Sequence, residues 1–272
     1  MSKVVLVDFN IFMFRSIFAW EKSRNMLPTY TTLSMLIACL KAVGCHPDDL
    51  IILAIDSSKG SWRKDIDPAY KANRREAREK HDINWDEMFS MFKDLLNKLK
   101  EATPFVQIVL DYLEADDIIS TACRYYKDKE VIIISSDSDY EQLAKYDYVK
   151  ILSPKDKTYK KVTNPDLILA KKIQKETTDN LVSEINNEED YLKREKIVNL
   201  LSLPSDIEEK VLRVLFEIEP VTNFDINKIP FKTMRDRFMS IYCEGTAEEE
   251  TIKKIEKKKA KLKKLKQRQL TI

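Results

Sequence analysis

The amino-acid sequence predicts an α/β fold with a central, mostly parallel sheet, helices on both faces of that sheet and a C-terminal helical region. Short runs rich in valine and isoleucine are separated by segments of helix length, which is typical of buried parallel strands joined by helices. After residue 152 the sequence becomes polar and helix-forming. A chain of 272 residues that is 43% hydrophobic can bury such a core and leave room for a smaller appendage.

Five apolar runs are the predicted strands of the sheet. In chain order they are residues 4–7, 51–55, 105–110, 131–134 and 148–152. Each has the length and composition of a buried strand. Three of the segments between them repeat apolar residues at the helical period, so we expect helices over residues 32–43, 85–100 and 115–126.

The chain divides into three predicted parts. Residues 1–152 form the α/β core, residues 153–243 a smaller helical region and residues 244–272 a lysine-rich tail. The net charge is +9 over residues 253–272 and +2 over the whole chain, so the remainder carries −7. Such a tail suits nucleic acid or an acidic partner, although a solvated amphipathic helix is an equally good interpretation.

Several classes of function are disfavoured by what the sequence lacks. Only three glycines are present, which argues against a glycine-rich phosphate loop. The four cysteines form no CxxC pair, and the two histidines are not spaced for a zinc site. No apolar run approaches the roughly 20 residues that span a bilayer, and no cleavable signal is recognisable. We therefore expect a cytoplasmic protein with no membrane partner, whose chemistry depends on carboxylates and basic groups.

Seven acidic residues stand at or just beyond the ends of predicted strands. They are Asp8, Asp56, Glu114, Asp116, Asp117, Asp137 and Asp139. Ligand sites in open α/β sheets lie beyond the carboxyl ends of the strands, so we expect these side chains to converge. Their repulsion would raise their pKa values unless cations intervene. Oxygen ligands suit Mg²⁺ or Mn²⁺, and two such ions about 3.5–4 Å apart can promote phosphodiester cleavage.

Each of these acids also has an ordinary alternative role. Asp8 or Asp56, taken alone, is more often a turn residue or a helix cap. Glu114, Asp116 and Asp117 would favour the positive end of a helix dipole. Capping needs one acid for each helix, whereas this chain supplies seven at strand ends, and the accumulation favours a metal cluster.

Four motifs contain these acids. They are residues 6–10 (Leu-Val-Asp-Phe-Asn), residues 56–63 together with 70–74, residues 114–117 and residues 135–140. In their order along the chain and in their residue types they resemble the motifs of the 5′ nuclease family of flap endonucleases, over roughly residues 4–180. The absence of a glycine-rich hairpin after the last acidic motif makes the chain similar to the ribonuclease H branch of T-even bacteriophages. The resemblance implies a PIN-like nuclease core with two Mg²⁺ ions, for which Mn²⁺ can substitute.

The resemblance also implies a role for each acid. The first metal is served directly or through water by Asp8, Asp56, Glu114, Asp116 and Asp137. Asp139 serves the second metal, and Asp117 stands behind the ligands. The family completes its second site with an acidic motif that Glu176 and Asp179 match. Glu176 stands where Asp is usual and Lys175 where Gly is usual, and we expect these departures to weaken the second site.

A basic segment follows Asp56. From Lys59 to Lys80 there are eight Lys or Arg against four acids, which suits the phosphates and bases of a single-stranded 5′ end. By itself this pattern indicates an exposed charged helix, but the resemblance implies a helical arch over about residues 57–84. Lys71 and Arg74 are then implied to contact the scissile phosphate. The other implied nucleic-acid contacts are Lys59, Trp62, Arg63, Tyr70, Arg75 and Arg78, with Tyr70 stacking on a base.

The implied function is that of a metal-dependent 5′-3′ exonuclease or flap endonuclease with RNase H activity, which removes RNA primers in replication. Its implied substrates are RNA-DNA hybrid and 5′-flap or nicked DNA, with residues 153–243 binding the duplex. A single-stranded DNA-binding protein and a replication polymerase are the implied protein partners. We expect a monomer, located in the host cytoplasm if the protein is phage-encoded.

Three other functions compete with this one. A phosphatase of the haloacid dehalogenase type needs a second Asp where this chain has Asn10. A PIN-domain ribonuclease is disfavoured by the chain length and the helical C-terminal region. A catalytically weak, nuclease-like module that binds nucleic acid or a replication partner remains the main alternative.

Overall fold

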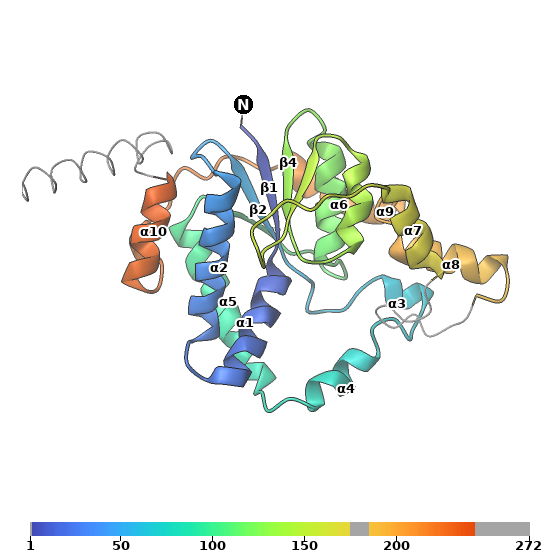
Figure 1. The fold of residues 1–272 in the computed structure, drawn as a ribbon, viewed down its shortest axis with the longest axis horizontal. Coiled ribbons are helices and arrows are strands. Elements are labelled where there is room, and N and C mark those ends of the chain that lie inside the picture. The colour runs from blue at the N-terminus through green and yellow to red at the C-terminus, as the bar shows by residue number, and fades with distance from the viewer. Residues whose placement is uncertain (1, 175–184, 243–272) are drawn as a thin grey trace, which may run out of the picture.

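The computed structural model describes residues 2–174 and 185–242, and its centre is a sheet of five parallel strands (Figure 1). In chain order the strands are β1 (Val4–Asp8), β2 (Leu50–Ala54), β3 (Val106–Ile108), β4 (Val131–Ile134) and β5 (Val149–Leu152). Their order across the sheet is β3-β2-β1-β4-β5. Because β1 pairs in parallel with both β2 and β4, the residues that follow these three strands meet at one edge.

Helices cover both faces of the sheet. Alternate residues of a strand point to opposite faces, so an apolar run such as β1 must be covered twice. Val5 and Val7 belong to one core and Val4 and Leu6 to the other. The first core is completed by α1 (Phe9–Ser23), α2 (Pro28–Val43), α5 (Trp85–Ala102) and α10 (Lys232–Tyr242). The second is completed by α6 (Ala115–Tyr125) and α9 (Ser205–Phe216).

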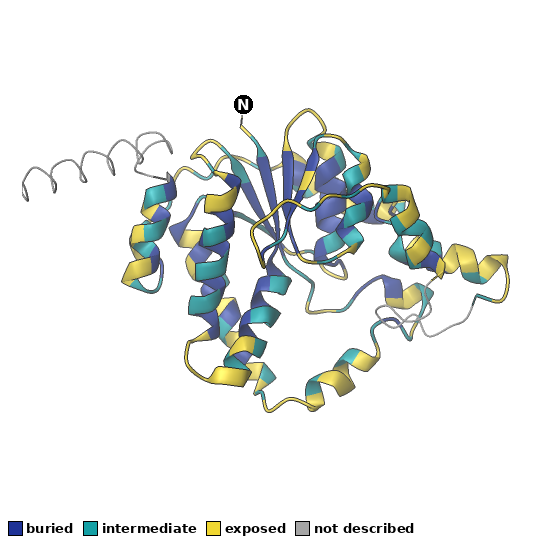
Figure 2. Ribbon diagram, in the orientation of Figure 1, coloured by how far each residue is buried: buried dark blue, intermediate teal, exposed yellow. Residues whose placement is uncertain are grey.

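The segment between β2 and α5 holds two short helices, α3 (Arg63–Ile66) and α4 (Asn73–Glu79). It leaves the sheet at the end of β2 and rejoins the rest of the fold at the start of α5, beside α1 (Figure 1). Figure 2 shows that the strands are buried, whereas α4 is exposed along most of its length. No residue of α4 is buried, so the helix is held at its two ends and not by a core of its own.

The C-terminal helices are distributed around the sheet. The helices not yet introduced are the 3₁₀ helix η1 (Asp139–Lys145), α7 (Pro165–Gln174), α8 (Glu188–Val198) and the short 3₁₀ helix η2 (Ile226–Lys228). Helix α7 packs on η1 and α8, while α9 packs on α6 and α10 packs on α2. The predicted division at residues 152 and 243 stays a prediction, and the lysine-rich tail lies outside the described residues.

The predicted fold class is confirmed: the sheet is parallel, both faces carry helices and the C-terminal region is helical. The third strand is shorter than the predicted run over residues 105–110, because the chain leaves the sheet after Ile108 and Val109 is 56% exposed. Helix α1 was not predicted. It begins at Phe9 directly after β1, so no turn residue marks its start. Within the described ranges, no helix is long and apolar enough to cross a membrane.

Candidate functional site

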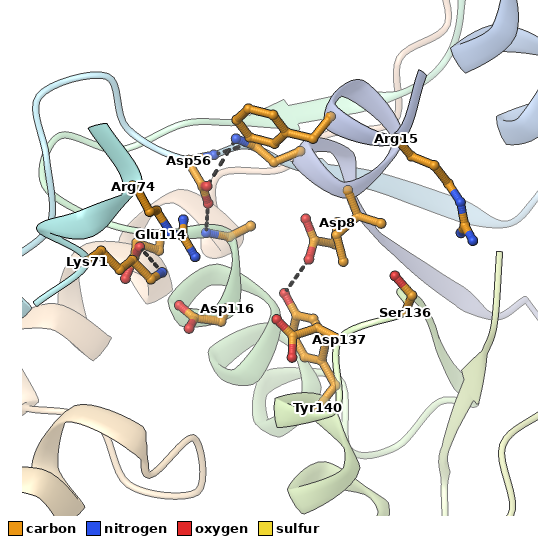
Figure 3. Close-up of a pocket in the computed structure, with 14 residues that line it drawn as sticks. Asp8, Arg15, Asp56, Lys71, Arg74, Glu114, Asp116, Ser136, Asp137 and Tyr140 are labelled. Atoms are coloured by element: carbon orange, nitrogen blue, oxygen red, sulfur yellow. Dashed lines mark hydrogen bonds and ion pairs between the residues drawn. The ribbon is translucent and has the colours of Figure 1, made fainter. Parts of the chain in front are cut away.

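Acids from three strands and one helix line a single cleft at the carboxyl edge of the sheet (Figure 3). Asp8 is the last residue of β1, and Asp56 and Asp137 follow β2 and β4 within three residues. The N-terminal end of α6 adds Glu114 and Asp116. The cleft has a volume of about 310 Å³. Its remaining lining residues are Asn10, Ile11, Phe14, Arg15, Lys71, Arg74, Ala115, Ser136 and Tyr140.

Asp8 is one of the acids in this cleft whose charge is unfavourable. Only 6% of its surface is exposed. The hydroxyl groups of Tyr140 and Ser135 donate hydrogen bonds to its Oδ2, at 3.2 and 3.3 Å. Burial, together with the charges of Asp56 and Asp137, raises the pKa of Asp8 to about 7. A cation bound in the cleft would relieve this repulsion.

Asp56 is fixed by partners on two other elements. Asn10 Nδ2 donates to Asp56 Oδ2 at 3.0 Å, and Asn10 Oδ1 accepts the backbone N–H of Asp56 at 3.1 Å. The backbone N–H of Ala115, at the start of α6, donates to Asp56 Oδ1 at 2.8 Å. Burial raises the pKa of this carboxyl. Its orientation therefore depends on α1 and α6 as well as on β2.

Glu114 is the most heavily bonded acid of the cleft. The hydroxyl groups of Ser61 and Tyr70 donate to its Oε2 at 3.1 and 2.9 Å. Arg63 Nη1 donates to the same oxygen at 3.1 Å, and Lys71 Nζ pairs with Oε1. Burial alone would raise the pKa of Glu114, but the charges of Lys71 and Arg63 outweigh it and hold the pKa at about 2.

Arg63 joins the acids of α6 to the rest of the structure. Its side chain is 1% exposed, and its Nη2 lies 3.3 Å from Asp116 Oδ1 and 2.9 Å from Asp117 Oδ1. Its Nε donates to the carbonyl of Ile197 in α8 at 2.8 Å. One guanidinium therefore contacts three buried carboxyl groups, of which it can balance one charge, and it ties α3 to both α6 and α8.

Asp117 has a structural role in this group. It is fully buried, and its Oδ2 accepts hydrogen bonds from Trp62 Nε1 at 3.1 Å and from the backbone N–H of Glu114 at 2.9 Å. The second bond is half of a capping box that starts α6. Asp117 is not among the residues that line the cleft.

Asp137 precedes η1, and Asp139 is the first residue of η1. Asp137 lines the cleft, and its Oδ1 accepts the backbone N–H of Asp139 at 2.9 Å. Asp139 is not among the cleft-lining residues, and its carboxylate pairs instead with Lys172 of α7. The two acids of one sequence motif thus face different surroundings.

Lys71, between α3 and α4, and Arg74, in the first turn of α4, bring positive charge to the cleft. Lys71 has a φ angle of 54°, in the left-handed region that costs a non-glycine residue roughly 1–2 kcal/mol. The residue before it, Tyr70, is buried, which fixes the chain where this turn occurs. The turn directs Lys71 Nζ to Glu114.

The metal ligands that the cleft can offer are carboxylate oxygens, and such oxygens bind hard divalent cations. Within residues 2–174 and 185–242, no three His, Cys, Asp or Glu side chains already converge as a preformed metal site. Arg63 and Lys71 explain part of this, since they occupy oxygens of Asp116 and Glu114. Asp8, Asp56 and Asp137 line one cleft, and a cation between them would relieve the repulsion that adds to burial in raising the pKa of Asp8.

Three of the predicted nucleic-acid contacts have buried side chains in this structure. Trp62, Arg63 and Tyr70 are 7%, 1% and 5% exposed. Tyr70 packs against Ile197 and donates its hydroxyl to Glu114, so its ring is not available to stack on a base. These side chains pack where α3 meets the rest of the structure. That interior position holds aromatic rings and a buried cation.

The other predicted contacts in this segment lie outside the cleft. Lys59 and Arg75 are exposed and pair with acids close to them, at 2.6 and 3.3 Å. Arg78 lies over three aromatic rings of α1 and α5, at 5.4 to 5.6 Å from their centroids, and burial lowers its pKa. Arg78 therefore attaches α4 to the core. Glu176 and Asp179, predicted for the second metal, lie outside the described residues.

Sequence reasoning missed the neutral side chains that hold the acids. Asn10 and Tyr140 bond Asp56 and Asp8, and each stands inside one of the acidic motifs. Their position in these motifs was the available signal. Lys172 gave no such signal, because α7 brings it to Asp139 from a different part of the chain.

Comparison with known proteins places this chain in a family. The sequence model of the family described as 5′-3′ exonuclease, N-terminal resolvase-like domain, matches residues 3–177. Ribonuclease H of Enterobacteria phage T4 is 37% identical over 115 residues, which are 41% of this chain and 38% of that protein. Flap endonuclease Xni of Shewanella sp. (strain ANA-3) is 29% identical over 147 residues, which are 53% of this chain and 52% of that protein.

Solved structures agree with this fold. The structure of T5 D15 protein co-crystallized with metal ions superposes with a TM-score of 0.62 at 16% identity, over 79% of this chain and 98% of that one. The matched stretches span only about half or less of the curated relatives. The match to the family covers well over half of this chain, as the four acidic motifs predicted. The chain therefore belongs to the 5′-3′ exonuclease and flap endonuclease family of nucleases.

Proposed function

We propose that this chain is a divalent-metal-dependent 5′ nuclease that hydrolyses phosphodiesters at the 5′ end of RNA-DNA hybrids and of 5′-flap or nicked DNA. The phage T4 relative is named ribonuclease H, which supports RNA-DNA hybrid as a substrate. The removal of RNA primers in replication would then be the task of this chain. One observation carries the proposal. The sheet brings Asp8, Asp56 and Asp137 to one cleft, beside the cations of Lys71 and Arg74.

Two Mg²⁺ ions, replaceable by Mn²⁺, are the proposed cofactors. The residues proposed to hold the first are Asp8, Asp56, Glu114, Asp116 and Asp137, and those for the second are Asp139, Glu176 and Asp179. Bound divalent ions supply an activated water and stabilise the leaving oxygen in phosphodiester hydrolysis. Structures of T5 D15 protein with metal ions and of T5 5′-exonuclease with zinc support a metal requirement.

The other residues of the cleft would position the substrate and the acids. Lys71 and Arg74 would contact the scissile phosphate and stabilise the charge that develops on it. Tyr140 and Asn10 hold Asp8 and Asp56 in place through the hydrogen bonds described above.

The rest of the chain would bind the substrate away from the cleft. Residues 57–84, with Lys59, Arg75 and Arg78, would guide the single-stranded 5′ end, and residues 153–243 would contact the duplex. A T5 D15 flap endonuclease complex with DNA supports nucleic acid as the ligand. A single-stranded DNA-binding protein and a replication polymerase are the proposed partners of a monomer in the cytoplasm, that of the host if the protein is phage-encoded.

Cleavage of two defined substrates tests this function. A 5′-labelled RNA-DNA hybrid and a 5′-flap DNA are incubated with the protein in Mg²⁺ and, in parallel, in chelator. We expect short labelled products in Mg²⁺ only, and the preferred substrate separates primer removal from flap cutting. Retained binding of both substrates without cleavage of either would overturn the enzyme proposal in favour of the binding module.

Lys71→Met is expected to lower the cleavage rate about 10²- to 10³-fold, because it removes a cation aimed at developing phosphate charge while keeping the length of the side chain. Lys64→Met is the matched control: Lys64 is exposed on α3, and its replacement removes the same charge from the same segment. Single-turnover rates on the flap substrate measure the effect. Equal rates for the two variants would remove Lys71 from the mechanism.

A further inference from the structure

Lys172 occupies the position beside Asp139 where the proposed function would place a metal ion. Its Nζ pairs with the Asp139 carboxylate and donates to Ser138 Oγ at 3.0 Å. The pair is well shielded from water, since the side chains are only 15% and 22% exposed. An ammonium group in this position supplies the positive charge that a divalent ion would otherwise supply.

The backbone of α7 holds Lys172 in this place. Ile173, the next residue, is 2% exposed, and its carbonyl accepts a hydrogen bond from Arg194 Nη1 of α8 at 3.1 Å. Lys172 also stands in the last turn of α7, where the helix dipole favours a cation. The pairing with Asp139 therefore follows from the packing of α7 and is not a chance contact of a long surface side chain.

A second lysine reinforces the positive charge on the same loop. Lys160 Nζ donates to the carbonyls of Ser136 and Asp137 at 3.3 and 3.2 Å. Two ammonium groups thus lie against the loop that carries Asp137 and Asp139. Lys160 also pairs with Glu141 at 3.0 Å, so the cation that a divalent ion approaching Asp139 would have to displace is Lys172.

We propose that Lys172 is a tethered cation that takes the place of the second divalent ion at Asp139. This inference rests on the proposed function, because it assumes that divalent ions bind in the cleft. It changes one part of that function: Asp139 is neutralised by the chain itself, and the strong metal site is the one lined by Asp8, Asp56 and Asp137.

Titration with Mn²⁺ alone, followed by the electron paramagnetic resonance signal of the free ion, tests this assignment without an activity assay. Lys172→Met keeps the aliphatic chain and removes the charge, so it is expected to bind an additional Mn²⁺ ion, or to bind the weaker ion at least roughly tenfold more tightly than wild type. Lys171→Met, an exposed neighbour on α7, removes the same charge and is expected to match wild type.

Asp139→Asn provides an independent readout that does not depend on the folding of the lysine variant. If Lys172 neutralises Asp139, this substitution leaves Mn²⁺ binding unchanged in number and within about twofold in affinity. Loss of a bound ion in Asp139→Asn, or identical binding by Lys172→Met and wild type, would overturn the assignment. Absence of any Mn²⁺ binding by wild type would instead contradict the metal requirement of the proposed function, and the assignment with it.

Discussion

Asp8→Asn is expected to reduce cleavage by more than about 10³-fold and, in the absence of metal, to make the protein more stable. Asparagine keeps an oxygen that can accept from Tyr140 and Ser135, so the geometry of the cleft is preserved. It removes the negative charge that burial, Asp56 and Asp137 oppose. Function and stability therefore change in opposite directions, as expected for a residue retained for chemistry at a cost in stability.

The stability effect has a defined dependence on pH. The pKa of Asp8 is about 7 in the folded protein and close to 3.8 without its surroundings. As pH rises, the carboxyl group of Asp8 therefore ionises at a lower pH in the unfolded chain than in the folded protein. The charge of Asp8 destabilises the fold increasingly as pH rises from about 4 to about 7. In chelator at pH above 7, the variant should gain about 2–4 kcal/mol in free energy of unfolding, and this gain should vanish near pH 4.

Urea unfolding of wild type and Asp8→Asn at several pH values, in chelator, measures this difference. Asp236→Asn is a suitable control for a general charge effect, because Asp236 lies on α10 and does not line the cleft. A variant that cleaves normally would remove Asp8 from the active site. A variant less stable than wild type at pH above 7 would show that the charge of Asp8 is compensated in the folded protein.

Arg63→Met is expected to destabilise the protein by about 3–5 kcal/mol, because it leaves buried carboxylates without their counter-ion. Arg63 contacts Glu114, Asp116 and Asp117, and Lys71 reaches only the first of these. The contact of Arg63 with the carbonyl of Ile197 is lost as well, which releases α8 from α3. Methionine fills part of the space, so the effect reports mainly on charge.

Acidification should reduce this difference. In wild type the pKa of Glu114 is lowered from its usual 4.5 to about 2, so its stabilising contribution is complete above pH 4.5 and is lost as pH falls toward 2. In the variant, the buried carboxyl groups are expected to take up protons more readily. Thermal or urea unfolding at pH 7 and near pH 3 checks this, with Lys64→Met as the exposed control on the same helix. A loss of less than about 1 kcal/mol at pH 7 would contradict the role of Arg63.

The sheet and its acids could be predicted because both depend on local patterns. A strand such as residues 131–134 is apolar throughout, and an acid after it must lie at the carboxyl edge of a parallel sheet. Asp8, Asp56 and Asp137 therefore met as predicted. Asp139 did not join them in the cleft, because η1 begins there and turns its side chain toward α7.

The partners of the acids could not be predicted in the same way. Arg63 and Tyr70 stand in a strongly charged segment, where sequence alone indicates contact with solvent or nucleic acid. Their burial depends on α8, which comes from a distant part of the sequence and supplies Ile197 to both. Such long-range packing leaves no periodic signal in the segment itself, and the same holds for Lys172.

Asp137→Ala tests whether the acids of the cleft carry out hydrolysis at a 5′ end. Asp137 lines the cleft, and among the described contacts its side chain bonds only the backbone N–H of Asp139, so its replacement should leave the fold intact. Wild type and variant are compared on one 5′-labelled flap DNA in Mg²⁺, with substrate binding measured in parallel. If the acids of the cleft carry out hydrolysis, cleavage disappears in the variant while binding remains. Cleavage by the variant at a rate close to that of wild type would contradict this role of the acids.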